Sequence, residues 1–126
     1  MVDHICTNLH QASRIGHHNC IKTLLVSQYT QLNIIDNNGK TALHIASEYG
    51  HSESMVTLLN AGIDINAKDI CGWTPLHIVA GMGNNDGILT LLNADTGGGF
   101  INIDEKSNNG DTPLHIVSSI GHIRYP

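Results

Sequence analysis

Histidine is the residue type in this sequence best suited to metal chemistry, and the chain contains nine of them. Structural zinc sites take four ligands from cysteines and histidines at short, characteristic spacings. The one local cluster of both types is His17-His18-Asn19-Cys20, which lacks paired Cys-x-x-Cys or similar zinc spacing. We therefore predict that the chain binds no metal ion.

Catalytic and cofactor chemistry is not indicated either. A nucleophile needs a base and an orienting group that converge on one pocket, and no residue pattern here suggests such a triad. The only glycine-rich stretch, Gly97-Gly98-Gly99, is not followed by the Lys-Ser/Thr pair of a phosphate-binding loop. We expect no enzymatic activity, no cofactor and no small-molecule substrate.

Four of the histidines instead close a recurring four-residue motif. The motif reads Thr7-Asn8-Leu9-His10, Thr41-Ala42-Leu43-His44, Thr74-Pro75-Leu76-His77 and Thr112-Pro113-Leu114-His115, and its threonines lie 34, 33 and 38 residues apart. A period in this range is typical of a repeat architecture. The elements that position the histidines must therefore repeat as well.

Each motif has the features of a helix N-terminus. A Thr hydroxyl can accept a hydrogen bond from an unpaired backbone N–H of the first turn. Pro75 and Pro113 fall at the first helical position, where a missing N–H costs nothing. Apolar or small residues follow at i, i+3 and i+4, and seven residues after each motif Leu stands a glycine: Gly16, Gly50, Gly83 and Gly121. A glycine at that point favours a left-handed helix end, so the spacing predicts short helices of about two turns.

A second helix and an extended return complete the predicted unit. Apolar helix ends are expected at Ile21–Leu25, Met55–Leu59 and Ile88–Leu92, each at the same distance from its motif His. Segments rich in Asp and Asn then close on Gly39, Gly72 and Gly110, which favours tight turns. In the third unit, Asn84, Asn85 and Gly87 predict a weak second helix.

This pattern resembles the ankyrin repeat, which runs Asp-x-x-Gly-x-Thr-Pro-Leu-His-x-Ala, then Gly-His, a Leu-Leu helix and a Val-Asn arm. The best-matching unit agrees at Asp36, Gly39, Thr41, Leu43, His44, Ala46, Gly50, His51, Leu58, Leu59, Gly62, Ile65 and Asn66. The resemblance implies an all-α ankyrin-repeat solenoid of antiparallel helix pairs joined by β-hairpin-like loops. It also implies structural roles for the motif residues, whose histidines hydrogen-bond between adjacent turns in this family: Thr41, His44, Thr74, His77, Thr112 and His115.

We expect one domain over residues 1–126, with units at about 1–35, 36–68, 69–106 and a truncated 107–126. The third unit carries an insertion near 95–100, expected either as a tolerated surface loop or as an element that presents Phe100 to a partner. The fourth stops before its second helix, so the chain is expected to be a fragment of a longer one. Asn66 lies where asparagines of ankyrin arrays can be hydroxylated in animal cells, and we expect it instead to hydrogen-bond its turn.

Composition restricts the partner and the compartment. The formal net charge is −5, and the six Lys and Arg are scattered, so no basic stripe is available for nucleic acid. No apolar run is long enough for membrane insertion. Three cysteines, unpaired by pattern, fit a reducing compartment. We therefore expect a cytoplasmic protein, with the nucleus, or the host cytosol for a pathogen effector, as alternatives.

Surface residues that depart from the repeat pattern are the candidate site. In arrays of this kind partners usually bind the concave side, formed by the hairpin tips and the first helices. An apolar, aromatic centre with a charged rim is typical of a protein-binding hot spot. The residues expected in that patch are Lys40, Glu48, Tyr49, Ile70, Cys71, Trp73, Met82 and Asp111. Trp73 has two open interpretations, partner contact or packing on its own hairpin.

These observations predict a non-enzymatic module that recognises a protein partner on its concave hairpin and inner-helix surface. The alternative is a targeting or regulatory ankyrin segment of a larger enzyme, channel or pathogen effector.

Overall fold

A computed structural model describes residues 8–26, 31–94 and 100–121, with side chains described up to residue 118. The described part contains seven helices and no strand. They are α1 (Leu9–Ile15), α2 (His18–Leu25), α3 (Ala42–Glu48), α4 (Ser52–Asn60), α5 (Pro75–Met82), α6 (Asn85–Leu92) and α7 (Pro113–Gly121). The all-α solenoid expected from the sequence is confirmed.

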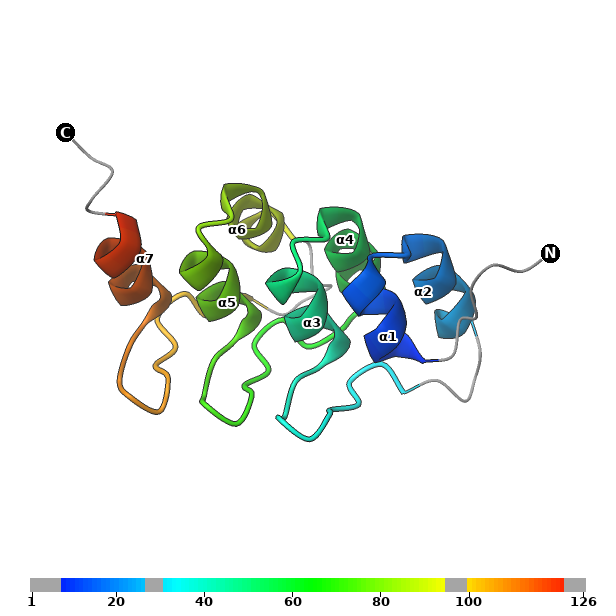
Figure 1. Ribbon diagram of the computed structural model, residues 1–126, viewed down its shortest axis with the longest axis horizontal. Coiled ribbons are helices and arrows are strands. Elements are labelled where there is room, and N and C mark those ends of the chain that lie inside the picture. The colour runs from blue at the N-terminus through cyan, green and yellow to red at the C-terminus, as the bar shows by residue number, and fades with distance from the viewer. Residues whose placement is uncertain (1–7, 27–30, 95–99, 122–126) are drawn as a thin grey trace.

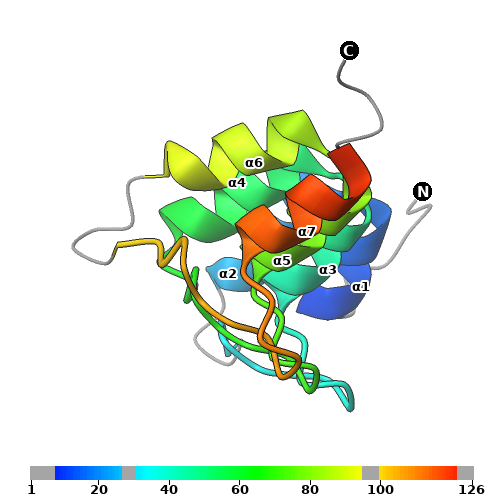
Figure 2. The same cartoon turned by 90° about the vertical axis from the view of Figure 1, so that its left-hand side faces the viewer.

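The helices form two rows along the array. The first helices of the units, α1, α3, α5 and α7, pack on one another in chain order, and the second helices α2, α4 and α6 form a row behind them (Figure 1). Seen along the array, the loops between units project together to one side of the helices (Figure 2). The first helices α1, α3, α5 and α7 are called the inner helices below, and the second helices the outer helices. The inner helices and these loops share one face of the molecule (Figure 2).

The core runs continuously through this double row. Ile21, Leu43, Met55, Leu58 and Leu91 are fully buried, and each comes from a position that recurs along the repeat. Burial of a large aliphatic side chain contributes roughly 1.5–3 kcal/mol, and a single unit has too few of them to fold alone. Stability of the array therefore depends on contacts between neighbouring units.

The motif Leu shows this dependence directly. Leu43 is 0% exposed and Leu76 5% exposed, whereas Leu114 at the same motif position is 72% exposed. The first two have described units on both sides. Burial at this position therefore comes from the neighbouring unit and not from the helix itself.

Helix ends follow the predicted chemistry with one correction. Thr41 and Thr74 are N-caps, while Gly16 and Gly83 are left-handed C-caps with φ values of 77° and 66°. In the first unit the N-cap is Asn8, whose side chain accepts from the Gln11 N–H, and not a threonine. Thr7 lies outside the described residues. Asparagine caps a helix as well as threonine does, because its side-chain oxygen reaches the same N–H groups.

Gly87 has a different role from the predicted weakening of α6 (Asn85–Leu92). It is buried, and a Cβ built there would lie 2.6 Å from Cγ1 of Val79 on α5. Asn84 caps this helix, with its side chain accepting from the Gly87 N–H at 3.0 Å. A glycine is therefore needed here because α5 and α6 approach too closely for a side chain.

Most of the insertion near 95–100 lies outside the described residues. Phe100 is described and is 88% exposed. Its carbonyl oxygen accepts a hydrogen bond from Asn66 Nδ2 at 2.7 Å, and Asn66 Oδ1 accepts from the Asn102 N–H at 2.7 Å. Asn66 therefore connects its own unit to the backbone of the following segment, where a bond within its own turn was expected.

Within the described segments, no helix is both long and apolar enough to cross a membrane.

Candidate functional site

The motif histidines are tied to the threonines that cap their helices. In the second unit His44 Nδ1 lies 3.1 Å from the Thr41 backbone nitrogen and 3.0 Å from Thr41 Oγ1. The His44 N–H donates in return to Thr41 Oγ1 at 3.3 Å. The same three contacts occur between Thr74 and His77, and between Thr112 and His115.

The other ring nitrogen connects neighbouring units. Nε2 of His10 lies 2.7 Å from the Lys40 carbonyl oxygen, His44 Nε2 lies 2.8 Å from that of Trp73, and His77 Nε2 lies 2.8 Å from that of Asp111. Each of these carbonyls belongs to the residue immediately before the next motif threonine. Because a carbonyl only accepts, Nε2 must carry the proton, and Nδ1 is left as the acceptor for the threonine N–H.

Burial favours the neutral form of His44. The surroundings of His44 lower its pKa below the ordinary 6.5, because burial disfavours the charged ring more than the Trp73 carbonyl favours it. Within the part of the chain described by the structure, no three His, Cys, Asp or Glu side chains converge in a way that could hold a metal ion. These histidines therefore act in the contacts between units.

The hairpin tips lie side by side through backbone contacts. The Ile70 N–H donates to the Asn38 carbonyl at 2.9 Å, and the Asn108 N–H donates to the Cys71 carbonyl at 3.0 Å. Gly72 has a φ of 78°, and a Cβ there would lie 2.7 Å from the Asn108 nitrogen. Glycine at this turn therefore allows both the left-handed conformation and the close approach of the next tip.

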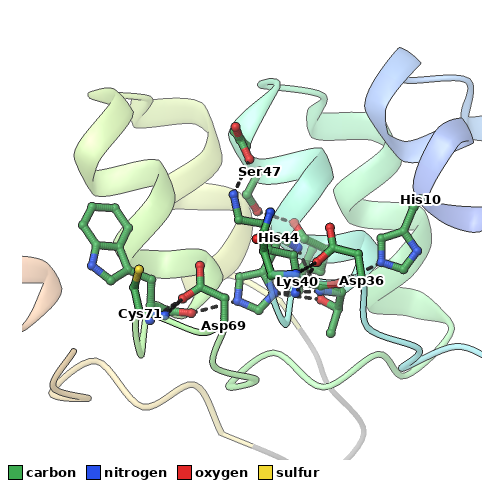
Figure 3. Close-up of polar contacts among 12 residues, drawn as sticks. His10, Asp36, Lys40, His44, Ser47, Asp69 and Cys71 are labelled. Atoms are coloured by element: carbon green, nitrogen blue, oxygen red, sulfur yellow. Dashed lines mark hydrogen bonds and ion pairs between the residues drawn. The ribbon is translucent and has the colours of Figure 1, made fainter. Parts of the chain in front are cut away.

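A groove of about 640 Å³ lies between these tips and the inner helices. It is lined by residues of the second, third and fourth units: Asn38, Lys40, Glu48, Asp69, Ile70, Cys71, Trp73, Ile78, Gly81, Met82 and Asn109. Figure 3 shows the polar contacts from His10 past Asp36, Lys40 and His44 to Asp69 and Cys71; of these residues, Lys40, Asp69 and Cys71 line the groove. Six of the eight residues proposed from the sequence thus line one groove: Lys40, Glu48, Ile70, Cys71, Trp73 and Met82.

The other two candidates are not in the groove lining. Tyr49 is 49% exposed and stacks on the ring of His51, with centroids 6.5 Å apart and an interplanar angle of 10°. Asp111 is exposed, and its carbonyl is the acceptor for His77.

Trp73 is half-buried, and its indole lies against Gly81 and His77 of the helix that follows it. A Cβ at Gly81 would lie 3.1 Å from Trp73 Cζ3, and the His77 ring centroid is 5.8 Å from that of Trp73. The backbone N–H of Trp73 donates to Asp69 Oδ1 at 3.0 Å, which holds the turn before the helix. The indole therefore packs on its own helix, while Ile70 and Met82 of the same groove are 67% and 60% exposed.

Sequence reasoning missed several residues of the groove, of which Gly81 and Asp69 matter most. Gly81 allows the indole to lie on the helix, and Asp69 holds the turn by accepting from the Cys71 and Trp73 N–H groups. The Asp at the start of each turn was visible in the sequence as a turn residue. Its place in the groove lining depends on how the turn folds back on the helix.

Charges at the groove are dominated by carboxylates. Lys40 Nζ lies 2.9 Å from Glu48 Oε1. This bond raises the pKa of Lys40 against the opposing effect of burial, with further contributions from the Asp69 and Asp36 charges. Burial alone would raise the pKa of Asp36, but the backbone N–H groups of Lys40 and Asn38 outweigh it and lower the value. The single ammonium is thus surrounded by three carboxylates.

The cysteines differ from the prediction that none is paired. Cys71 is an exposed free thiol in the groove, whereas Cys20 on α2 is disulfide-bonded. A disulfide requires its two cysteines to be close in space but not in sequence, so sequence spacing does not reveal the bond.

The fold and the spacing of its units agree with comparisons to known families. A family model described as ankyrin repeats in three copies matches residues 3–69, and a model of the single ankyrin repeat matches residues 71–108. Proteins built from these repeats are generally protein–protein interaction modules, and the repeats themselves are typically non-enzymatic. The chain belongs to the ankyrin repeat family.

Proposed function

We propose that this chain binds a protein partner on its concave face, with the groove between the hairpin tips and α3 and α5 at the centre of the interface. The observation that carries the proposal is the composition of that groove. Exposed apolar groups from Ile70 and Met82 flank a fixed indole, and charged groups of Lys40 and Glu48 lie at the edge. Large exposed apolar groups beside a pre-positioned aromatic ring are typical of binding hot spots.

The rigidity of Trp73 favours this function. A side chain that is already ordered loses little conformational entropy on binding, and each immobilised side chain otherwise costs about 0.5–1.5 kcal/mol. A stable interface usually buries about 1,200–2,000 Å² in total, so neighbouring tips such as Asn38 and Asn109 would contribute to the surrounding contact.

The test uses two matched double variants in a pull-down from cell extract. The groove variant Ile70→Ser/Met82→Ser removes two exposed apolar groups without touching the core. The control variant Val56→Ser/Leu89→Ser removes groups that are 44% and 55% exposed on the outer helices. We expect a captured protein that is retained by the wild type and the control variant but lost from the groove variant, with circular dichroism unchanged in all three. If the groove variant retains every protein that the wild type captures, the groove is not the binding site.

A further inference from the structure

We infer that the groove takes a basic, apolar segment of the partner protein, in which an arginine stands beside a bulky apolar side chain. This inference rests on the proposed function, since it names the chemistry of the segment that the groove would bind.

The apolar walls of the groove favour an apolar side chain in the bound segment. Trp73, Ile78 and Met82 come from the hairpin and helix of one unit, and Ile70 adds a largely exposed aliphatic group from the tip. A volume of about 640 Å³ is enough for one large side chain and part of its neighbours. Water at such a surface is displaced favourably by an apolar side chain of the partner.

The balance of charges in the groove favours a basic residue in the bound segment. Three charged residues line the groove, namely Lys40, Glu48 and Asp69. Lys40 pairs directly with Glu48 and is also attracted by the charge of Asp69, so this one ammonium is shared by two carboxylates of the groove. Asp36 adds a further negative charge beside Lys40, and the whole chain has a formal net charge of −5. A cationic group of the partner would complete this arrangement.

Arginine suits the site better than lysine because of the indole. Its planar guanidinium stacks on an aromatic face and bonds carboxylates through two parallel N–H groups. The backbone N–H of Trp73 donates to Asp69 Oδ1, and both the indole and this carboxylate line the groove. One arginine can therefore meet both an aromatic face and a carboxylate.

A display selection from random short peptides tests this inference without assuming a partner. The target is the wild-type chain, and the Ile70→Ser/Met82→Ser variant serves for counter-selection. We expect the enriched peptides to carry arginine next to Leu, Ile, Met or an aromatic residue. Enrichment of acidic or uncharged peptides overturns the inference but leaves the groove as a binding site. No enrichment over the counter-selection also overturns it, while the pull-down above judges the proposed function separately.

Two charge variants then distinguish charge complementarity between groove and peptide from damage to the fold. Lys40→Gln and Glu48→Gln both destroy the same ion pair, so damage to the fold would weaken binding in both. On the inference, Lys40→Gln tightens binding of the enriched peptide and Glu48→Gln weakens it, each by about fivefold at low ionic strength.

Binding can be followed through Trp73, which is the only tryptophan in the sequence. Asp86→Asn on the outer helix α6 is the matched control, because it changes the net charge as Glu48→Gln does and lies outside the groove lining. We expect no change in affinity for that variant. Shifts of the same sign in Lys40→Gln and Glu48→Gln, or an equal loss in Asp86→Asn, would contradict the inference.

Discussion

At the scale of single residues, the motif histidine shows how one side chain serves two elements. One ring nitrogen of His44 accepts from the N–H of the cap residue Thr41, and the other donates to the carbonyl of Trp73 in the next unit. Both contacts need the neutral ring with its proton on Nε2. A second proton on Nδ1 would face the Thr41 N–H, so acid should weaken this contact.

Stability should therefore fall in mild acid. His44 in the unfolded chain titrates near 6.5, while its pKa in the folded chain is lower. Between these two values the unfolded chain holds a proton that the folded chain lacks. The free energy of unfolding should decrease as the pH falls below 6.5, by at most about 1.4 kcal/mol per pH unit from this group, and should level off below the folded pKa.

The measurement is urea denaturation across this pH range for the wild type and His44→Gln. The difference between the two slopes isolates His44 from other titrating groups. His115→Gln, at the exposed motif position, is the control, because it removes the same side chain without opening a buried site. Equal slopes in the wild type and His44→Gln would contradict the assignment.

At the scale of elements, helix pairing within a unit depends on how closely the backbones approach. α5 (Pro75–Met82) and α6 (Asn85–Leu92) meet where Gly87 faces Val79. Glycine lowers helix propensity by about 1 kcal/mol relative to alanine, and that cost is outweighed here by the space that it leaves. Similarly, Gly81 leaves room for the indole of Trp73.

We predict that Gly87→Ala destabilises the protein by about 1–2 kcal/mol, although alanine is the better helix former. The added Cβ would have to lie 2.6 Å from Val79 Cγ1. The double variant Gly87→Ala/Val79→Ala should be more stable than the sum of the single effects predicts, because the smaller residue at 79 removes the closest of the clashing atoms. Thermal unfolding of the three variants measures this. If Gly87→Ala is stabilising, the close approach does not limit the pairing.

At the scale of the whole molecule, the array is held by the same contacts repeated from unit to unit. His10, His44 and His77 each reach a carbonyl of the following unit, and the hairpin tips add backbone hydrogen bonds between Asn38 and Ile70 and between Cys71 and Asn108. In such a linear array each unit is stabilised mainly by its neighbours. The binding groove is formed by the same contacts, since it is lined by tips and helices of successive units.

Removing one of these contacts should matter more in the middle of the array than at the last motif. His44→Ala leaves the Thr41 N–H and the Trp73 carbonyl without a partner in a buried site, and we expect a loss of about 3 kcal/mol. His115→Ala removes the same local bonds at an exposed position and should cost about 1 kcal/mol or less. Denaturant unfolding of both variants compares the two positions, and similar losses would mean that the contact between units contributes little.

The sequence by itself determined the repeat and the local structure of each unit. The threonine caps at 41 and 74, the left-handed glycines at 16 and 83 and the second helices follow from short-range hydrogen bonding and from the 3.6-residue helical period, which neighbouring residues reveal. Residues at equal positions in successive units lie side by side. The position of each candidate within the repeat was therefore enough to place six of the eight candidates in the lining of one groove.

Only the tertiary structure decided contacts that depend on the distance between elements. These contacts are the close approach of α5 to Gly87, the packing of Trp73 on Gly81, the hydrogen bonds from Asn66 to the following segment and the disulfide at Cys20. The residue types involved do not reveal these contacts in the sequence. Tyr49 and Asp111, the two candidates outside the groove lining, make contacts that the period does not reveal: Tyr49 stacks on His51, and the Asp111 carbonyl lies against His77. Periodicity specifies which residues are neighbours, whereas close packing decides which side chains touch.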